Sequence, residues 1–304
     1  MKTPDNKFQE NLSTCPICKK SFEEGDEVFT IQTRENQFVM LHKKCQDKIS
    51  DAGFKTIKVS PPPRLKSTDQ LWRYMELPKF ISMLKNGAIY FSSPKGFSDI
   101  YEGAYCSQHN KDDWDNFHLS FLRIAIITAP DNRWHNIKPD DVEENAQQLL
   151  RRLSKHNDDK IFISCWHNCD FESEAMWKMY SVNNKYAIAI QCNFESLSRE
   201  LRRKAQIRPV TYIDYTKHFV GTNESYWFKR KAFEYEKEVR AIIYDFKNKG
   251  KTGIEIKVNL ESLIQNVYIS PYAPDWFSEV VSDLISRYGY KLNVHPSSMA
   301  LPLL

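Results

Sequence analysis

The chain has 304 residues, of which 41% are hydrophobic and 27% charged, enough apolar material for a folded core. Its net charge of +4 is too small to indicate a protein dedicated to nucleic-acid binding. The polar amino terminus lacks a secretory signal, and apolar runs such as Ile124–Ala129 are shorter than the roughly 18 residues of a membrane span. We therefore expect a cytoplasmic protein without a membrane partner, whose seven cysteines are reduced thiols or metal ligands.

Four potential metal ligands form two pairs near the amino terminus, Cys15 with Cys18 and His42 with Cys45. The first pair is a C-x2-C knuckle and the second an H-x2-C turn, and the segments EVFTI and FVMLH between them predict two strands. Zinc binds four such ligands as a tetrahedron, and because protein groups would fill every position, we expect a structural Zn²⁺. The segment is similar to a treble-clef or LIM-type half-site, and the alternative is that these cysteines are buried free thiols.

Three consecutive prolines at 61–63 favour an extended, stiff backbone that cannot continue a helix. A short segment with little apolar material precedes them, and such a segment depends on a metal for stability. We therefore predict a zinc-binding module over residues 1–60, a proline-rich linker over 61–68 and an α+β domain over 69–304.

Within the large domain, Leu71–Met75 predicts a strand, and a helix with Pro78 in its first turn should end at Gly87. Ala88–Ser93 predicts the next strand. Because strands also follow one another directly, the pattern favours a mixed or split sheet with surrounding helices over a doubly wound parallel sheet. The further expected elements are a helix carrying Val142, Ala146, Leu149, Leu150 and Leu153, strands in IFISCW, YAIAIQC, VTYI, EVRAIIYDF, GIEIKV and NVYIS, and a last helix carrying Phe277, Val280, Val281, Leu284 and Ile285.

The segment LWRYMELPKFISMLKNGAIYFSSPKGFSDIYEG resembles the opening of the bacterial domain of unknown function 2971 family. The shared features are a Y-R-Y-type strand, a helix ending in N-G, a Y-F-S-S-P segment and an F-N-D-P-x-E-G-like turn. Ser98 and Ile100 stand where that turn usually has Asn and Pro. The resemblance continues through ISCWHNCDFESEAMWKMYS and RKAFEYEKEVRAI and covers roughly 230 residues. The family name implies no mechanism, so the chemistry has to come from the residues.

The order of strand, helix, strand and a late E-x-E motif is also similar to the ADP-ribosyltransferase superfold, in which a split sheet holds NAD. This similarity implies Glu238 as the catalytic carboxylate, Glu236 as the group that orients an acceptor, and Arg73 and Ser92 as further catalytic residues. Cleaving nicotinamide from ribose develops positive charge on the sugar, which a carboxylate stabilises, and an arginine can bind ribose or diphosphate. The residues implied in binding NAD are Arg73, Tyr74, Tyr90, Ser92, Ser93, Trp177 and Tyr180.

The implied function is transfer of ADP-ribose from NAD to a protein or nucleic acid, or simple NAD cleavage, and a role in phage defence would suit such an enzyme. The same residues also have interpretations in which they serve only the structure. Glu236, Glu238 and Arg240 follow the period of a strand and are typical of an exposed, solvated sheet face. Arg73 is typical of a packed arginine, for which Glu102 is a candidate ion-pair partner, and Trp177 of a core residue.

Two other classes of function stay open. The first is a binding module without catalysis, in which the zinc module and two basic stretches, 199–208 and 229–231, grip nucleic acid or protein while Trp227, Phe228 and Phe233 stack on bases. The second is a metal-dependent nuclease or hydrolase that uses Glu102, Glu174 and Glu238. A second metal site would have to come from Cys106, His109, Cys165, His167 and Cys169.

Overall fold

The computed structural model describes residues 15, 18, 20–32, 38–45, 64–127, 139–153, 158–180, 185–221 and 225–300. The prolines at 61–63, predicted to stiffen a linker, lie outside these residues. The chain divides into two compact units that interleave along the sequence. Unit 1 comprises residues 1–60, 104–156 and 214–225, and unit 2 comprises residues 61–103, 157–213 and 226–304.

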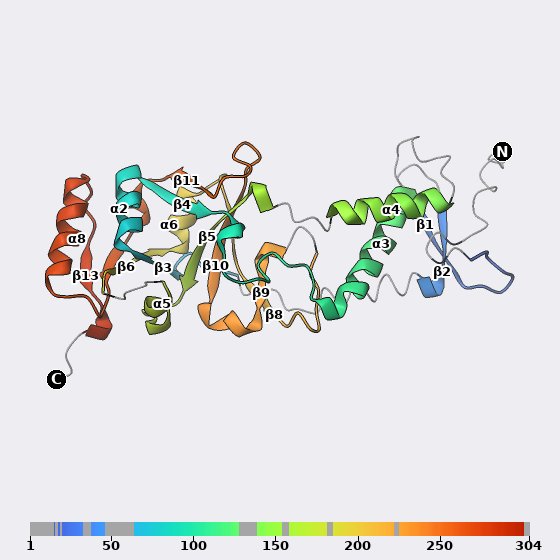
Figure 1. Cartoon of the computed structure of the whole chain (residues 1–304), viewed down its shortest axis with the longest axis horizontal. Helices are drawn as coiled ribbons and strands as arrows, with labels where there is room; N and C mark the ends of the chain where they lie inside the picture. Colours follow the sequence, from blue (N-terminus) through green and yellow to red (C-terminus); the bar gives the residue numbers. More distant parts are fainter. Residues whose placement is uncertain are drawn as a thin grey trace. The chain divides into compact units, whose positions relative to one another are not determined.

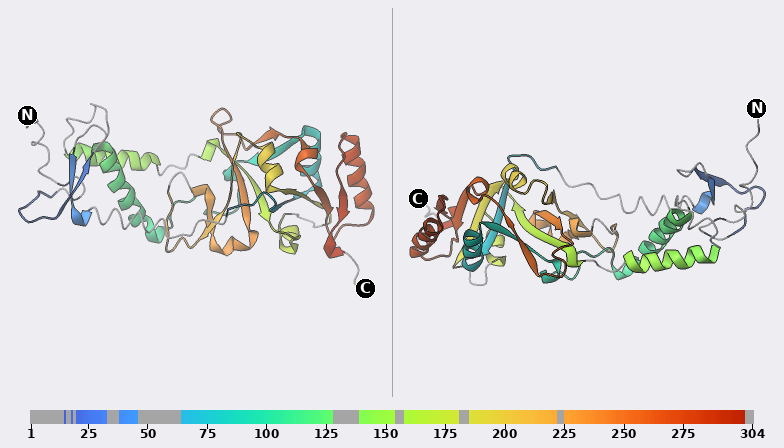
Figure 2. Two further views of the ribbon diagram at one scale, coloured as in Figure 1. Left: turned by 180° about the vertical axis from the view of Figure 1, so that it is seen from behind. Right: turned by 90° about the horizontal axis from the view of Figure 1, so that it is seen from above.

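Unit 1 contains a small hairpin and a pair of helices. Strands β1 (Val28–Gln32) and β2 (Phe38–His42) pair in antiparallel fashion, as the sequence predicts. Helices α3 (Lys111–Ile127) and α4 (Pro139–Leu153) lie side by side (Figures 1 and 2). Their apolar faces share one core. The buried members of that core are Trp114, Leu122, Ile126, Val142, Ala146, Leu150 and Phe219.

The composition of unit 1 differs from the predicted domain plan. Residues 104–156 and 214–225, which the sequence places inside one large domain, group instead with the first 60 residues. The physical reason is that α3 and α4 bury their apolar faces in a core of their own. The division into a zinc-binding module over 1–60, a linker over 61–68 and a single domain over 69–304 stays a prediction.

Unit 2 is built around a nine-stranded mixed sheet, which confirms the α+β fold class (Figure 1). The strand order is β11-β4-β5-β3-β6-β12-β13, and β10 pairs with both β5 and β7. All pairs are antiparallel except β12 with β13. The strands are β3 (Gln70–Glu76), β4 (Ala88–Ser92), β5 (Ile161–Asn168), β6 (Ala187–Asn193), β7 (Gln206–Pro209), β10 (Glu238–Tyr244), β11 (Gly253–Lys257), β12 (Asn266–Ile269) and β13 (Val294–Pro296).

The sheet is split along one edge of β5. The other edge of β5 is filled by β10, which pairs with it from Ile161 to His167. On the split edge, β4 reaches only Ile163, while β3 pairs only with His167 and Asn168. Strands β3 and β4 therefore diverge from a common neighbour and leave a gap between them, as in the split sheet that the sequence predicts.

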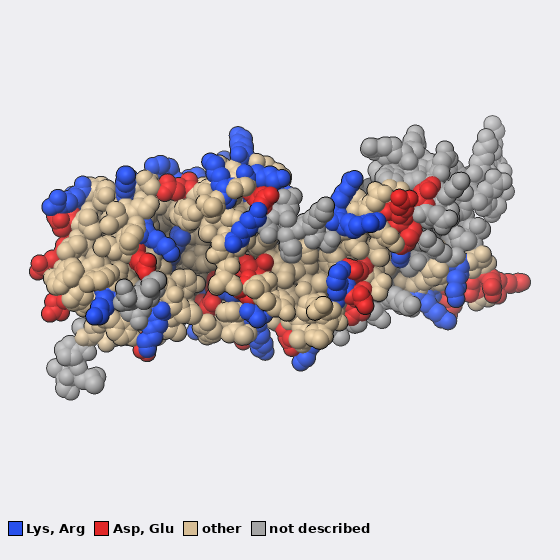
Figure 3. Space-filling model, in the orientation of Figure 1, with Lys and Arg blue, Asp and Glu red and all other residues tan. Residues whose placement is uncertain are grey.

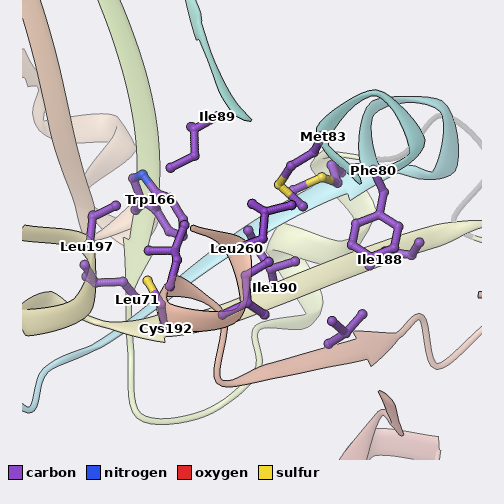
Figure 4. Close-up of a cluster of buried hydrophobic side chains, with 14 of the residues drawn as sticks. Leu71, Phe80, Met83, Ile89, Trp166, Ile188, Ile190, Cys192, Leu197 and Leu260 are labelled. Carbon is purple, nitrogen blue, oxygen red and sulfur yellow. The ribbon is translucent and has the colours of Figure 1, made fainter. Parts of the chain in front are cut away.

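One face of this sheet packs against helices and carries the main core (Figure 4). Helix α2 begins with Pro78 in its first turn and ends at Gly87, whose φ of 51° is the left-handed conformation that glycine adopts without strain. The close-up shows side chains of α2, the central strands and the segment at Leu260 pointing into one another. The covering helices are α2 (Leu77–Asn86), α6 (Phe194–Glu200), α7 (Leu260–Leu263) and α8 (Trp276–Arg287).

The opposite face carries two smaller apolar clusters. The first joins β3 and β6 to α5 (Glu174–Met179), with Trp72, Tyr74 and Trp177 buried. The second joins β5 and β10 to Tyr226 and Trp227. These precede β9 (Phe228–Arg230), which pairs in parallel with β8 (Thr211–Ile213). Of the helices that the structure describes, none combines the length and the apolar character needed to cross a bilayer.

Candidate functional site

A cavity of about 700 Å³ opens at the split in the sheet of unit 2. Its lining comes from both sides of the gap: Arg73 and Tyr74 from β3, Tyr90 and Ser92 from β4, and Cys165 from β5. Other lining residues come from α2, the segment 96–102, β9 and β10. The place where the strands diverge is therefore also the place where charged and aromatic side chains gather. We call this space the split-sheet cavity.

Arg73 spans the gap. Its Nη2 donates a hydrogen bond of 2.8 Å to the carbonyl oxygen of Tyr90 on β4, and its guanidinium lies 5.8 Å from the ring centroid of Trp166 on β5. Among the residues that the structure describes, no carboxylate forms an ion pair with it, so the predicted pairing with Glu102 is wrong. Burial lowers the pKa of the Arg73 guanidinium, although an arginine stays charged at neutral pH. A half-buried cation with unused N–H groups is suited to bind an anion.

A group of five charged side chains forms another part of the lining. Arg240 is fully buried, and its Nε lies 2.8 Å from Glu238 Oε1, while its Nη2 lies 2.9 Å from Glu102 Oε2. Lys229 Nζ contacts Glu236 and lies 3.1 Å from Glu238 Oε2. Glu102 therefore pairs with Arg240, because strand β10 directs that guanidinium toward the segment that precedes Gly103.

The predicted solvated strand face is also wrong. Glu238 and Arg240 are 4% and 0% exposed, so their alternation serves buried pairing instead of solvation. Glu236 is not on the strand at all: it ends the 3-10 helix Lys231–Glu236, and Lys237 follows with a φ of 40° before β10 begins at Glu238. This turn is what brings the Glu236 carboxylate to Lys229.

The three carboxylates of this group differ in their affinity for protons. Burial disfavours the charged form of Glu238, but Arg240 and Lys229 outweigh it and lower the pKa of Glu238 to about 2. Burial raises the pKa of Glu102 and of Glu236, against the opposing effects of Arg240 and Lys229. Glu238 is therefore an anion at any physiological pH, and Glu102 and Glu236 take up a proton more readily than Glu238 does.

The segment from Ser93 to Gly103 forms one wall of the cavity, and ion pairs hold it to neighbouring strands. Asp99 Oδ1 lies 2.7 Å from Arg230 Nη2, and Glu102 is held by Arg240. Gly103 ends the segment with a φ of +73°, and a Cβ atom there would lie 2.6 Å from the Tyr226 ring. Only glycine fits this conformation and this close approach.

The structure brings most of the predicted site residues together. Arg73, Tyr74, Tyr90, Ser92, Tyr180, Glu236 and Glu238 all line the split-sheet cavity. Two residues implied in NAD binding are placed elsewhere: Ser93 is 3% exposed, and Trp177 is 0% exposed with its Nε1 donating to Glu172 Oε2 at 3.1 Å. Neither is among the lining residues, and Trp177 packs edge-on against Tyr74 as a core residue. Their role in binding NAD stays a prediction without support from position.

The site residues predicted from the sequence do not include Arg240 or Lys229, although the run EYEKEVR places charges immediately before the apolar residues of β10. Charges adjoining a buried strand are the signal that would have indicated a paired, desolvated group. Lys229 belongs to a basic stretch for which the alternative hypothesis was contact with nucleic acid, and its 11% exposed side chain and two carboxylate partners contradict that role.

Two residues of the basic stretches contact other side chains of unit 2. Arg230 pairs with Asp99, and the Arg208 guanidinium covers Trp227 at 4.1 Å from its ring centroid. Trp227 is only 3% exposed, so its predicted stacking on bases is wrong. In the face that Figure 3 shows, basic and acidic side chains are interspersed over the described part of the chain.

The zinc ligands predicted at the amino terminus converge in unit 1. One ligand atom from each of Cys15, Cys18, His42 and Cys45 lies within 4.8 Å of the others. His42 directs Nδ1 to Cys18 Sγ at 3.2 Å, while its Nε2 lies 3.0 Å from Asp26 Oδ2. A carboxylate behind a ligating histidine fixes the ring for metal binding, so this donor set fits Zn²⁺. Asp26 was not among the residues predicted for this site.

No other convergence of this kind forms among the described residues. Within that part of the chain, the Cys15 cluster is the one place where three or more His, Cys, Asp or Glu ligand atoms converge. A second metal site from Cys106, His109, Cys165, His167 and Cys169 is therefore wrong for the described residues. The guanidinium of Arg240 lies between Glu102 and Glu238, where the nuclease reading requires a metal. Glu174 instead pairs with Lys178, outside the cavity lining.

Comparisons with known proteins give a similarity among solved structures only. Neither a protein-family model nor a curated protein matches the chain, so the resemblance to the domain of unknown function 2971 family stays a prediction. Among solved structures, the chain is similar to DarT from Thermus sp. 2.9 in complex with NAD⁺, with a TM-score of 0.38 and 7% identity. The similarity covers 79% of this chain and 100% of that chain.

Proposed function

We propose that the split-sheet cavity binds NAD and that unit 2 cleaves its nicotinamide–ribose bond, passing ADP-ribose to a protein or nucleic-acid acceptor or to water. The observation that carries this proposal is the distribution of charge in the lining. Arg73, a cation with no ion-pair partner among the described residues, and the five-charge group around Glu238 line the same cavity.

The two parts of the lining have opposite electrostatic character. The five-charge group contains two cations, Lys229 and Arg240, against the three carboxylates of Glu102, Glu236 and Glu238, so its net charge is −1 when all are ionised. NAD has the complementary arrangement. Its diphosphate is anionic, whereas the departing nicotinamide leaves positive charge developing on the ribose. Arg73 would bind the diphosphate, and the carboxylate group would stabilise the sugar cation.

The individual residues suit these roles. Glu238 stays ionised because Arg240 and Lys229 hold its pKa at about 2 against the cost of burial, so a fixed negative charge is present before the ligand arrives. Tyr90 and Tyr180 are 44% and 41% exposed at the cavity and offer flat surfaces on which nicotinamide or adenine can stack. The volume of about 700 Å³ falls within the range typical of ligand pockets.

The test measures binding and turnover separately on the full chain. Calorimetric titration with NAD should show binding to the wild type, and Arg73→Gln should weaken it at least tenfold because the anion contact is lost. Release of nicotinamide, followed by chromatography, should fall at least a hundredfold in Glu238→Gln. A matched control is Arg287→Gln, because Arg287 pairs with Asp283 on the exposed side of α8.

Two outcomes would contradict the proposal. One is a wild type that neither binds NAD at millimolar concentration nor releases nicotinamide from it. The other is equal NAD affinity in Arg73→Gln and Arg287→Gln with both proteins folded, because the cavity arginine would then make no contact that the surface arginine lacks.

We also propose that Cys15, Cys18, His42 and Cys45 bind a structural Zn²⁺. The convergence of the four ligand atoms within 4.8 Å and the Asp26 carboxylate behind His42 support it. Four protein ligands leave no open position for a reacting water, so this metal would stabilise its module and take no part in the chemistry of unit 2.

A further inference from the structure

A buried imidazole, that of His167, also lines the split-sheet cavity. The residue lies on β5 and is 3% exposed. Its Nδ1 is hydrogen-bonded to the carbonyl oxygen of Glu236. A carbonyl oxygen only accepts, so Nδ1 carries the hydrogen, and in the neutral ring Nε2 is left with a lone pair. Among the described residues, nothing bonds to Nε2.

An unused acceptor in such a place requires an explanation. Leaving a buried polar atom without a partner costs about 1–3 kcal/mol, and most buried polar side-chain atoms do have one. Burial also lowers the pKa of His167 from its ordinary value of 6.5, with Lys237 acting in the same direction and the Glu236 carbonyl opposing it. The ring is thus neutral at physiological pH. His167 lines the split-sheet cavity, and its Nε2 holds a lone pair that has no partner among the described residues.

The position of His167 relates this lone pair to the proposed chemistry. On one side its strand partner is Trp72 of β3, and on the other it is Glu238 of β10. Residues directly opposite each other in a sheet point to the same face, so His167 and Glu238 are neighbours on the cavity side. The Tyr74 ring lies edge-on to the imidazole, with 6.4 Å between ring centroids. A molecule whose ribose lies at Glu238 would place its reacting carbon on this face.

We propose that His167 Nε2 is the base that accepts the proton of the incoming nucleophile. This inference rests on the proposed function. The nucleophilic atom, an oxygen or nitrogen that carries a hydrogen, forms a bond to ribose C1′. At the same time the bond from C1′ to the nicotinamide nitrogen breaks. The electron pair of the broken bond leaves with nicotinamide, which becomes neutral. The proton of the nucleophile passes to Nε2 and is later released to solvent.

The test uses NAD alone as the probe, with water as the nucleophile, and two variants of complementary geometry. His167→Asn keeps a donor near the position of Nδ1 for the Glu236 carbonyl and removes Nε2. His167→Gln places an amide near the position of Nε2, where it can accept a hydrogen bond but cannot take up a proton. We expect both variants to bind NAD within threefold of wild type and to lose a factor of about 10²–10⁴ in kcat, the range typical of general base catalysis.

The pH profile of kcat distinguishes a base from a purely structural residue, because losing a structural residue would leave the shape of the profile unchanged. In the wild type, kcat should fall as the pH drops through the depressed pKa of the imidazole, and this acid limb should vanish in His167→Asn. The charged and titratable groups near the ring are Glu236, Glu238, Lys237 and Tyr74, and Lys229 and Cys165 line the same cavity. Glu236 has a raised pKa, so Glu236→Gln is the control, and the acid limb should persist in it.

The outcomes separate the two proposals. If the wild type consumes NAD and His167→Asn keeps its kcat and its acid limb, the role of His167 is refuted while the proposed function stands. If the limb disappears in Glu236→Gln instead, the base is Glu236 and the inference fails. A wild type that neither binds nor consumes NAD overturns the proposed function itself. Thermal midpoints within a few degrees of wild type show that the variants are folded.

Discussion

Replacing Arg240 by methionine should destabilise unit 2 strongly, because this arginine is the shared partner of two buried carboxylates. Its side chain is fully buried and donates to Glu238, to Glu102 and, at 2.7 Å, to the carbonyl oxygen of Tyr226. Methionine fills a similar volume without any donor. The change therefore leaves two buried acidic groups and one carbonyl without their partner, and removes little packing.

The expected magnitude follows from the partners left behind. Breaking a buried ion pair by removing one member costs about 3–5 kcal/mol, because the other charge stays buried and uncompensated. Glu238 keeps Lys229 at 3.1 Å, so Glu102 bears most of the loss. Protonating a carboxyl of ordinary pKa at pH 7 costs about 3 kcal/mol, which limits the penalty for each group. We expect a loss of about 3–5 kcal/mol, a large part of the stability of a typical domain.

Urea unfolding followed by tryptophan fluorescence measures this loss, since Trp72, Trp166 and Trp177 are all buried in unit 2. Arg287→Met is the matched control, because the same substitution there removes an exposed i, i+4 pair worth about 0.3–0.5 kcal/mol. Adding Glu102→Gln to Arg240→Met should restore part of the stability by removing the unpaired charge. If the two single variants cost the same, the carboxylates around Arg240 are not desolvated and the reasoning is refuted.

Three further predictions concern other parts of the molecule. Gly103→Ala should cost more stability in urea unfolding than Gly250→Ala, because both have positive φ but only the former places a Cβ against the Tyr226 ring; equal losses would contradict the close approach. The free energy of unfolding of unit 2 should fall by about 3 kcal/mol as the pH drops from 4.5 to 2. The reason is that Glu238 has a pKa of about 2 when folded and an ordinary value of 4.5, so its stabilisation is present above pH 4.5 and is lost as the pH falls to 2. Urea unfolding of Glu238→Gln should lack this part of the pH dependence. Elemental analysis should find one zinc per purified chain, none in Cys45→Ala and one in Cys192→Ala, whose thiol is buried away from the cluster; zinc retained in Cys45→Ala would refute the ligand set.

Local pattern was sufficient to predict several elements. Pro78 and Gly87 mark the two ends of α2, and the knuckle spacing of the zinc ligands lies within short segments whose geometry is largely fixed by the chain itself. The apolar run of β5 and the alternation in β12 similarly predicted strands that the structure contains. A helix or strand can be predicted from the sequence when the residues that determine it lie within that helix or strand.

Features that depend on distant partners were not predicted. Glu102 and Arg240 are 138 positions apart, and nothing near either one indicates the other. The order of strands in the sheet has to be known before the contact between Arg240 and the segment that precedes Gly103 can be predicted. Helix α3 was also not predicted, because its aromatic and β-branched residues give only a weak helical period.

The position of Glu236 shows how a short irregularity changes a site. Period two assigned Glu236, Glu238 and Arg240 to one continuous strand, but Lys237 adopts a left-handed conformation that ends the 3-10 helix before the strand begins. Glu236 and Glu238, only two positions apart in the sequence, thereby acquire different environments. One has a raised pKa and the other a lowered pKa.

The attachment of the cavity wall at Asp99 and Glu102 has a consequence for how a ligand would be captured. A loop that must become ordered on binding loses conformational entropy at that moment, which weakens affinity and slows association. Here the pairs with Arg230 and Arg240 order the segment during folding, and the buried Glu102–Arg240 pair, being shielded from water, resists screening by salt. Capture should therefore behave as entry into a preformed receptor, with an association rate that shows no gating step.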